Sequence, residues 1–209
     1  MTIPHHEPGK PSFRETSKEA LLFVLRPAVR WLSVMRVRPD TLTVVGWTLA
    51  LGAAVLFGLG YARVAGLVML LGGIFDALDG AVARETNRMS SFGAFLDSTV
   101  DRVGEGFMIG AIGLVFMRHD EMWALALAFA AIAGSFLVSY TRARAEALGL
   151  KGDVGFGSRA ERVSVITTGL VLAPLHHLIL PSVIALLAAT AWLTVVQRIL
   201  FVRKQLSGA

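Results

Sequence analysis

Cysteine is missing from this sequence, and charged side chains are scarce. None of the 209 residues is cysteine, which excludes disulfides, thiol chemistry and metal sites built from thiolates. Charged residues make up 17% of the chain, whereas an average soluble domain carries about 25%. The first 20 residues are polar and lack the apolar core of a signal peptide, so we expect insertion to depend on the first spanning helix.

Long apolar runs make up much of the sequence. They lie at roughly residues 42–62, 64–83, 103–117, 122–141, 163–180 and 182–202. Most approach the ~20 residues that a helix needs to cross the hydrocarbon layer of a bilayer. We therefore predict an all-α integral membrane protein in which residues 39–204 form a domain of six transmembrane helices. The alternative is a soluble all-helical protein with buried core helices.

The positive charges are distributed unevenly along these runs. The net charge is +5 and the pI is about 10.2. If the segment before Pro39 is cytoplasmic and the helices alternate, eighteen of the twenty Lys and Arg residues lie inside, leaving only Arg63 and Arg118 outside. This asymmetry follows the positive-inside rule, and anionic lipid accounts for the basic charge without a nucleic-acid partner. We expect a multi-pass protein of the cytoplasmic membrane whose functional site faces the cytoplasm.

The N-terminal segment divides into a tail and a helix. Residues 1–15 contain three prolines and a glycine and predict a flexible tail. Residues 16–38 predict an amphipathic juxtamembrane helix lying in the membrane surface. Its apolar positions recur at helical intervals, at Leu21, Leu25, Ala28, Leu32 and Met35. Pro27 removes a backbone donor, so we expect a kink or a break there.

Four aspartates lie inside or beside two of the apolar runs, where unpaired carboxylates are costly. Asp76 and Asp79 are three residues apart, and Asp97 and Asp101 four, so each pair shares one helical face. The short connection at 84–92 makes the two helices antiparallel, and their acidic faces can converge near the inner membrane surface. Hard oxygen ligands suit Mg²⁺, Mn²⁺ or Ca²⁺. Two such ions would give a roughly neutral site able to hold a phosphate or diphosphate.

Other residues around the aspartates fit the same interpretation. Gly80 and Gly93 are poor helix formers, so we expect a ligand or a neighbouring backbone to approach them closely. Arg84 offers a forked cation for phosphate oxygens. Intramembrane acids also occur in ion pathways, which leaves an ion-coupled transporter as an alternative. Aspartate-rich prenyltransferases bind magnesium diphosphate by similar physics, but their acids lie in two widely separated motifs.

Together these residues form the pattern Asp76-x2-Asp79-Gly80-x2-Ala83-Arg84-x8-Gly93-x3-Asp97-x3-Asp101. This pattern resembles the full signature of the CDP-alcohol phosphotransferase family, with every defined position filled. The predicted spans, the surface helix and the chain length also resemble that family. The resemblance implies a homodimeric enzyme that transfers a phosphatidyl group from CDP-diacylglycerol, or a similar CDP-lipid, to an alcohol and releases CMP.

The resemblance also implies roles for single residues. Asp76, Asp79, Asp97 and Asp101 would bind two ions, Mg²⁺ or alternatively Mn²⁺, on the diphosphate. Asp101 would in addition take the proton of the acceptor hydroxyl as the catalytic base. The positions implied at the CDP-lipid are Asp40, Thr41, Leu42, Thr43, Gly80, Arg84 and Ser90.

A second group of cations concerns the acceptor. The stretch RARAEALGLKGDVGFGSRAER, residues 142–162, resembles the phosphatidylinositol-phosphate synthase branch of the family. In that branch a basic pocket takes the phosphate of inositol phosphate, and the resemblance places Arg142, Arg162 and Arg198 there. Three cations suit a phosphorylated acceptor better than an uncharged one. We therefore expect CDP-diacylglycerol and 1D-myo-inositol 3-phosphate to react to phosphatidylinositol phosphate.

Several alternatives remain at this level. Glycerol 3-phosphate also carries a phosphate, as in phosphatidylglycerol-phosphate synthases, and an archaeal CDP-lipid could replace diacylglycerol without changing any residue named above. Glu105 has no assigned role; it would either pair with Arg102 or take part in the site. Outside the family, a transporter and a structural membrane protein are the other classes.

Overall fold

The computed structural model describes residues 13–152, 154–155 and 159–207. These residues form seven helices, one short 3-10 turn and no strand. In chain order they are α1 (Phe13–Val34), α2 (Pro39–Gly58), α3 (Ala62–Glu85), α4 (Ser91–Arg118), α5 (Met122–Ala147), α6 (Arg159–Leu172), η1 (Ala173–Leu175) and α7 (Ile179–Ser207). The all-α prediction is therefore confirmed for the described residues.

Four of these helices are long and apolar enough to cross a membrane. They are α2, α3, α5 and α7. α4 has 28 residues, but it carries four charged side chains before its last three turns: Asp97, Asp101, Arg102 and Glu105. α6 has only 14 residues, fewer than the ~20 that a span needs. The six apolar runs thus correspond to six helices after α1, of which four are candidate spans.

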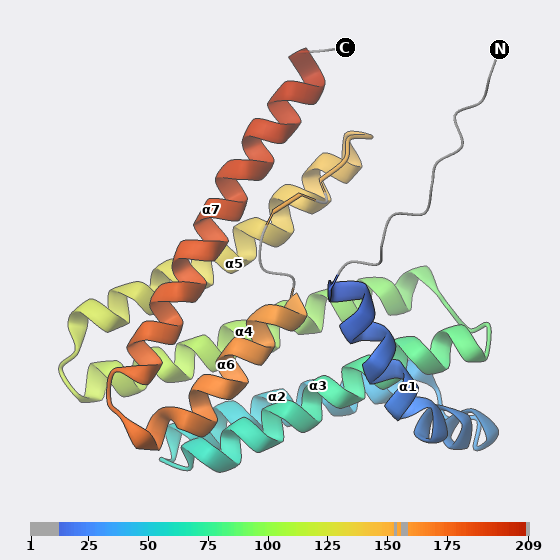
Figure 1. Cartoon of the computed structure of the whole chain (residues 1–209), viewed down its shortest axis with the longest axis horizontal. Helices are drawn as coiled ribbons and strands as arrows, with labels where there is room; N and C mark the ends of the chain where they lie inside the picture. The colour runs from blue at the N-terminus through green and yellow to red at the C-terminus, as the bar shows by residue number, and fades with distance from the viewer. Residues whose placement is uncertain (1–12, 153, 156–158, 208–209) are drawn as a thin grey trace.

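α2, α3 and α4 run side by side, and α5 and α7 rise steeply from them (Figure 1). α2 packs against both α3 and α4, so it lies between the two helices that carry the aspartates. The contact between α2 and α3 is close at Gly46 and Gly72, where a Cβ on either glycine would lie 3.0 Å from the carbonyl oxygen of the other. Side chains of α2 to α7, among them Met108, Ile112, Ile166, Leu170 and Ile184, form the main apolar core.

α1 packs across α3 near the end of the bundle where α3 and α4 are joined (Figure 1). The apolar cluster between them contains Val29, Leu42, Leu78, Ala81 and Val82, with Leu25, Ala28 and Leu32 packed against it. Met35, expected on the same face, is exposed, as are Phe23 and Trp31. Part of the apolar face of α1, which was predicted to meet lipid, therefore packs against the protein instead.

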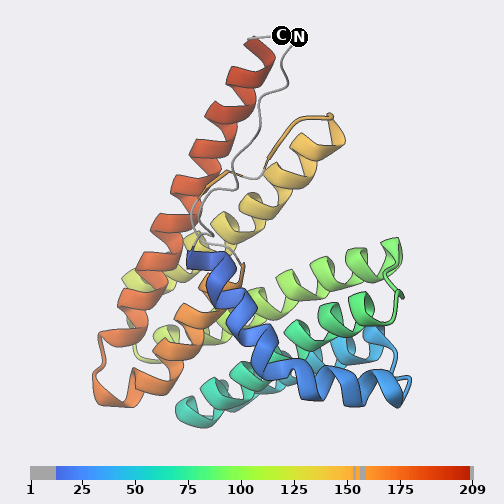
Figure 2. The same ribbon diagram turned by 45° about the vertical axis from the view of Figure 1, so that its right-hand side comes forward.

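The ends of α1 differ from the sequence-based expectation. The helix begins at Phe13, inside the predicted tail, and residues 1–12 lie outside the described residues. Pro27 lies within the helix and does not break it. Figure 2 shows that α1 changes direction part-way along its length, as a missing backbone donor in a helix interior favours.

Candidate active site

Three aspartates from two helices meet toward the end of the bundle where α3 and α4 are joined. Asp76 of α3 and Asp97 and Asp101 of α4 each offer a carboxylate oxygen, and these oxygens lie within 4.8 Å of one another. Asp101 is buried, and the other two are half-buried. The expected convergence of the acidic faces is therefore present for three of the four residues.

Asp79, the fourth aspartate, has a separate partner. Its side chain is 7% exposed, and its Oδ2 accepts a hydrogen bond of 2.5 Å from Thr43 Oγ1 of α2. Thr43 thus fixes the Asp79 carboxylate against α2. The sequence pattern placed Asp79 with the other acids but gave no reason to expect this bond.

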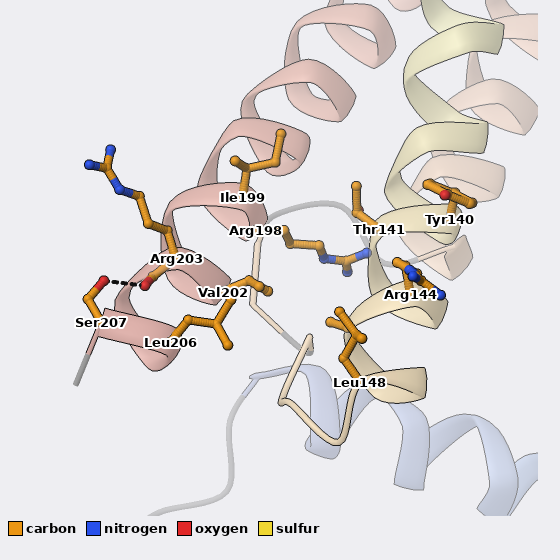
Figure 3. A pocket seen from close by; sticks show the side chains of 11 residues that line it. Tyr140, Thr141, Arg144, Leu148, Arg198, Ile199, Val202, Arg203, Leu206 and Ser207 are labelled. Carbon is orange, nitrogen blue, oxygen red and sulfur yellow. Dashed lines mark hydrogen bonds between the residues drawn. The ribbon is translucent and has the colours of Figure 1, made fainter. Parts of the chain in front are cut away.

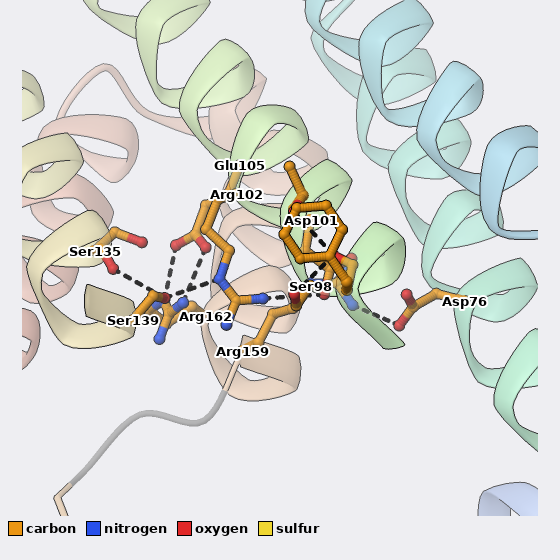
Figure 4. Close-up of polar contacts among 11 residues, drawn as sticks. Asp76, Ser98, Asp101, Arg102, Glu105, Ser135, Ser139, Arg159 and Arg162 are labelled. Atoms are coloured by element: carbon orange, nitrogen blue, oxygen red, sulfur yellow. Dashed lines mark hydrogen bonds and ion pairs between the residues drawn. The ribbon is translucent and has the colours of Figure 1, made fainter. Parts of the chain in front are cut away.

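Arg159, the first residue of α6, reaches into the acidic cluster (Figure 4). Its Nη1 lies 2.5 Å from Asp76 Oδ2, and its Nη2 lies 2.5 Å from Asp101 Oδ1. Burial lowers the pKa of Arg159, but the charges of Asp101 and Asp76 outweigh it and raise the pKa above its ordinary value. The guanidinium therefore stays charged and links α3 to α4.

A second ion pair lies on the next turn of α6. Nε and Nη2 of Arg162 lie 2.7 and 2.9 Å from the two carboxylate oxygens of Glu105 on α4. Both residues are almost fully buried, with exposed fractions of 5% and 4%. Glu105 thus pairs with Arg162; Arg102 instead binds Ser139 Oγ at 2.8 Å and lies 3.4 Å from Asp101 Oδ2.

A pocket of about 220 Å³ opens beside the acidic cluster, between the start of α2 and the connection from α3 to α4. Its lining includes five of the seven positions implied at the CDP-lipid, together with two of the aspartates: Asp40, Thr43, Gly80, Arg84, Ser90, Asp79 and Asp97. Of the other two, Leu42 is buried in the cluster under α1 and Thr41 is exposed. Neither lines the pocket.

Gly93 explains how α4 can approach the start of α2. A Cβ at this position would lie 3.0 Å from Ser90 Oγ and 3.1 Å from Asp40 Oδ1. Ser90 Oγ also accepts a hydrogen bond of 2.9 Å from the Gly93 backbone N–H, which caps α4. The glycine therefore leaves room for two polar side chains at the pocket wall.

The three arginines expected to bind the acceptor phosphate have different surroundings. Arg162 pairs with Glu105, as described above. Arg142 lies on the exposed side of α5 and pairs with Glu146 one turn away, at 2.8 Å. Arg198 of α7 donates to the carbonyl oxygens of Val138 and Val154. It also lines a cleft of about 470 Å³ between the ends of α5 and α7, with Arg144 and Arg203 (Figure 3).

Comparison with known proteins places this geometry in a family. The family model described as CDP-alcohol phosphatidyltransferase matches residues 36–200. The chain belongs to this family. The match includes all four aspartates, the pocket beside them and both arginines of α6.

Individual members of the family align with this chain over most of their length. An archaetidylinositol phosphate synthase of Pyrococcus horikoshii is 35% identical over 178 residues, which cover 84% of this chain and 88% of that protein. A phosphatidylinositol phosphate synthase of Mycobacterium tuberculosis is 34% identical over 190 residues, covering 88% and 87%. The chain is therefore similar to synthases of inositol-containing lipid phosphates.

Solved structures of the Mycobacterium tuberculosis phosphatidylinositol phosphate synthase have the same fold. The structure with CDP-DAG bound superposes with a TM-score of 0.78 at 32% identity, covering 84% of this chain and 92% of that chain. The structure in complex with manganese and citrate gives a TM-score of 0.79 at 33% identity, with 84% and 87% covered. The family and its apolar helices indicate a membrane-bound enzyme.

The acidic cluster fits the divalent ions that such enzymes use. Its donors are carboxylate oxygens, the preferred ligands of Mg²⁺ and Mn²⁺. Asp97 Oδ1 is buried and has no hydrogen-bond partner among the described residues, so a ligand atom is available there. Asp76, Asp97 and Asp101 could hold an ion directly, and Asp79 lies one helical turn from Asp76.

Sequence reasoning missed Arg159 as a member of this site. It treated Arg159 as one of several cations at the inner surface, whereas the guanidinium contacts two of the predicted metal ligands. The available signal was its position three residues before Arg162, which places both side chains on one helical face. Nothing in the sequence shows which carboxylate each arginine meets.

Proposed function

We propose that this protein transfers a phosphatidyl group from CDP-diacylglycerol to 1D-myo-inositol 3-phosphate, releasing CMP and forming phosphatidylinositol phosphate. The observation that carries the proposal is the meeting of Asp76, Asp97 and Asp101 beside a pocket lined by the positions implied at the CDP-lipid. Family membership supplies the reaction type, and the similarity to inositol phosphate synthases favours this acceptor.

In this proposal Asp76, Asp79, Asp97 and Asp101 hold two Mg²⁺ ions, with Mn²⁺ as a substitute. When bound, the ions polarise the phosphoryl group and neutralise charge on the departing CMP. The chain fixes these ligands from both sides: Thr43 holds Asp79 against α2, and Arg159 holds Asp76 and Asp101.

Asp101 is the residue we assign to the acceptor hydroxyl. Its carboxylate is buried on α4 between Arg159 and Arg102, and divalent ions bound at the site would favour its ionised form. A carboxylate in this state accepts the hydroxyl proton and, above all, positions the oxygen for attack on the phosphorus. The CMP leaves on the side of the pocket lined by Gly80 and Arg84.

The acceptor phosphate is assigned to three arginines. Arg142, Arg162 and Arg198 were assigned to it by resemblance, and Arg162 would have to share its guanidinium with Glu105. Glycerol 3-phosphate remains the alternative acceptor. The Pyrococcus relative, named an archaetidylinositol phosphate synthase, supports an archaeal CDP-lipid as the alternative donor.

We further propose a homodimer of six-span subunits in the cytoplasmic membrane, with the site at the cytoplasmic side. In this orientation the acidic cluster and, if the helices alternate, most of the arginines lie on the cytoplasmic side, as the positive-inside rule predicts. A lipid donor can then keep its acyl chains in hydrocarbon while a water-soluble acceptor reaches Asp101 from the cytoplasm.

The test is an acceptor comparison with purified protein in lipid nanodiscs that contain labelled CDP-diacylglycerol. Inositol 3-phosphate, glycerol 3-phosphate, inositol and serine are supplied in parallel, each with Mg²⁺ or with a chelator. We expect CMP and a labelled lipid product from inositol phosphate, and only with the metal. Product from glycerol phosphate alone would refute the acceptor, and ion flux across vesicles without CMP formation would favour a transporter.

A further inference from the structure

Arg159 binds two of the carboxylates that would hold a metal ion. Its two terminal nitrogens bind Asp76 and Asp101 separately, each at 2.5 Å, so one guanidinium bridges α3 and α4 (Figure 4). A divalent ion would be held by carboxylate oxygens of the same two residues. Arg159 and such an ion therefore compete for Asp76 and Asp101.

The guanidinium does not complete the cluster. One positive charge bridges two of three converging carboxylates, and the third, Asp97, has a buried Oδ1 with no hydrogen-bond partner among the described residues. The Nε of Arg159 is likewise buried without a partner. Buried polar groups without partners cost free energy, so this arrangement holds the acids together but leaves both sides unsatisfied.

Arg159 has room to leave without disturbing α6. The pair of Arg162 and Glu105 anchors the same turn of the helix to α4 from a nearly dry position. The Arg159 side chain is 29% exposed and lines a groove of about 620 Å³ between α3 and α6 that also reaches Asp76. One arginine is thus fixed, and its neighbour borders open space.

We propose that Arg159 is a displaceable counter-ion that makes metal binding depend on the anionic substrate; this rests on the proposed function, because it concerns loading of the same site. An ion that takes over Asp76 and Asp101 leaves the guanidinium without partners, which is unfavourable in a partly buried site. The diphosphate of a CDP-lipid offers replacement oxygens that match the guanidinium fork. Metal and CDP-lipid then strengthen each other's binding through Arg159, and such coupling is reciprocal.

The experiment measures Mn²⁺ binding rather than turnover. Mn²⁺ is titrated into purified protein in nanodiscs with and without CDP-diacylglycerol, in the absence of acceptor, and followed by calorimetry and by the electron paramagnetic resonance of free Mn²⁺. We expect Arg159→Gln to bind Mn²⁺ about tenfold more tightly than the unmodified protein without CDP-lipid, within the range of typical coupling factors. The additional gain caused by CDP-lipid should shrink by the same factor.

Two further variants keep the result decisive. Arg159→Lys retains the charge but cannot bridge two carboxylates with a planar fork, so we expect an intermediate gain in affinity. Arg63→Gln removes the same charge from the far end of α3, where Arg63 is exposed, and should bind Mn²⁺ like the unmodified protein.

Equal or weaker Mn²⁺ binding by a monodisperse Arg159→Gln or Arg159→Lys variant would overturn the proposal. A purely structural role for Arg159 predicts that outcome, because loss of a structural contact lowers stability without freeing a metal site. The Mn²⁺ titration does not depend on CMP release. A protein that transfers nothing to inositol phosphate would therefore fail the proposed function while still deciding the role of Arg159.

Discussion

Arg159 and Arg162 are three residues apart on one helix, yet they make opposite kinds of ion pair. Arg162 and Glu105 match one positive with one negative charge and are almost fully buried. Arg159 meets an excess of carboxylates and remains partly exposed. A balanced buried pair leaves no charge free, and removing one of its partners is costly, whereas an unbalanced and open cluster retains the capacity to bind something else. Arg162 therefore anchors α6 to α4, whereas Arg159 belongs to the candidate active site.

Asp101→Asn changes the unbalanced acidic cluster around Arg159 and should have the largest effect on activity. The amide keeps the shape but loses the charge that binds metal and accepts the proton. We expect turnover to fall by at least ~100-fold, as for loss of general-base catalysis. The thermal unfolding midpoint should change little, because the cluster carries surplus negative charge. Measured CMP release close to that of the unmodified protein would contradict the assignment of Asp101.

Glu105→Gln probes the balanced side and should act on stability. It leaves the Arg162 guanidinium buried without a compensating charge, which typically costs ~3–5 kcal/mol. Differential scanning calorimetry of both proteins in one detergent should therefore show a clearly lower unfolding midpoint for the variant. The double variant Glu105→Leu with Arg162→Met removes both charges and should recover most of the loss. A double variant less stable than the single one would show that the pair does more than neutralise itself.

Thr43→Val should have the smallest effect and extends the comparison to Asp79. The side chains have similar shapes, but valine removes the hydrogen bond to Asp79 Oδ2, and bonds to charged groups contribute about 1.5–3 kcal/mol. We expect the KM for CDP-diacylglycerol to rise about tenfold, with a smaller change in kcat. Thr48→Val is the matched control, because Thr48 Oγ1 donates to its own helix, to Val44 O. Equal KM values in both variants would rule out positioning of Asp79 by Thr43.

The helices and the acidic cluster follow from local sequence features. Hydrophobic runs and the spacing of Asp76, Asp97 and Asp101 are short-range patterns, and both are present in the structure. Most of the CDP-lipid positions also line one pocket, because they come from the start of α2 and from the connection between α3 and α4, the two helices against which α2 packs. The number of membrane crossings is harder to predict from the sequence. α4 carries several charged side chains, and α6 is shorter than a typical span.

The partners of charged residues could not be predicted in the same way. Arg159 meets Asp76 across 83 positions, and Arg162 meets Glu105 across 57. Such pairs depend on the orientation and axial position of α6 relative to α3 and α4, which no local sequence pattern encodes. Pro27 was more predictable, because its missing donor is a local feature: of the expected kink or break, the helix continues and changes direction (Figure 2).

The second half of α3 is largely enclosed by other helices and borders open space only at the groove and the pocket of the site. From Gly72 to Ala83 no residue is exposed, since Gly72 contacts α2, Asp76 faces α4 and α6, and Leu78 and Val82 lie under α1. Most substitutions in this segment would therefore change a contact with a neighbouring helix or the wall of the site. Mutational tolerance should be lowest here, and adaptation to a different lipid or acceptor has to arise from the surrounding helices.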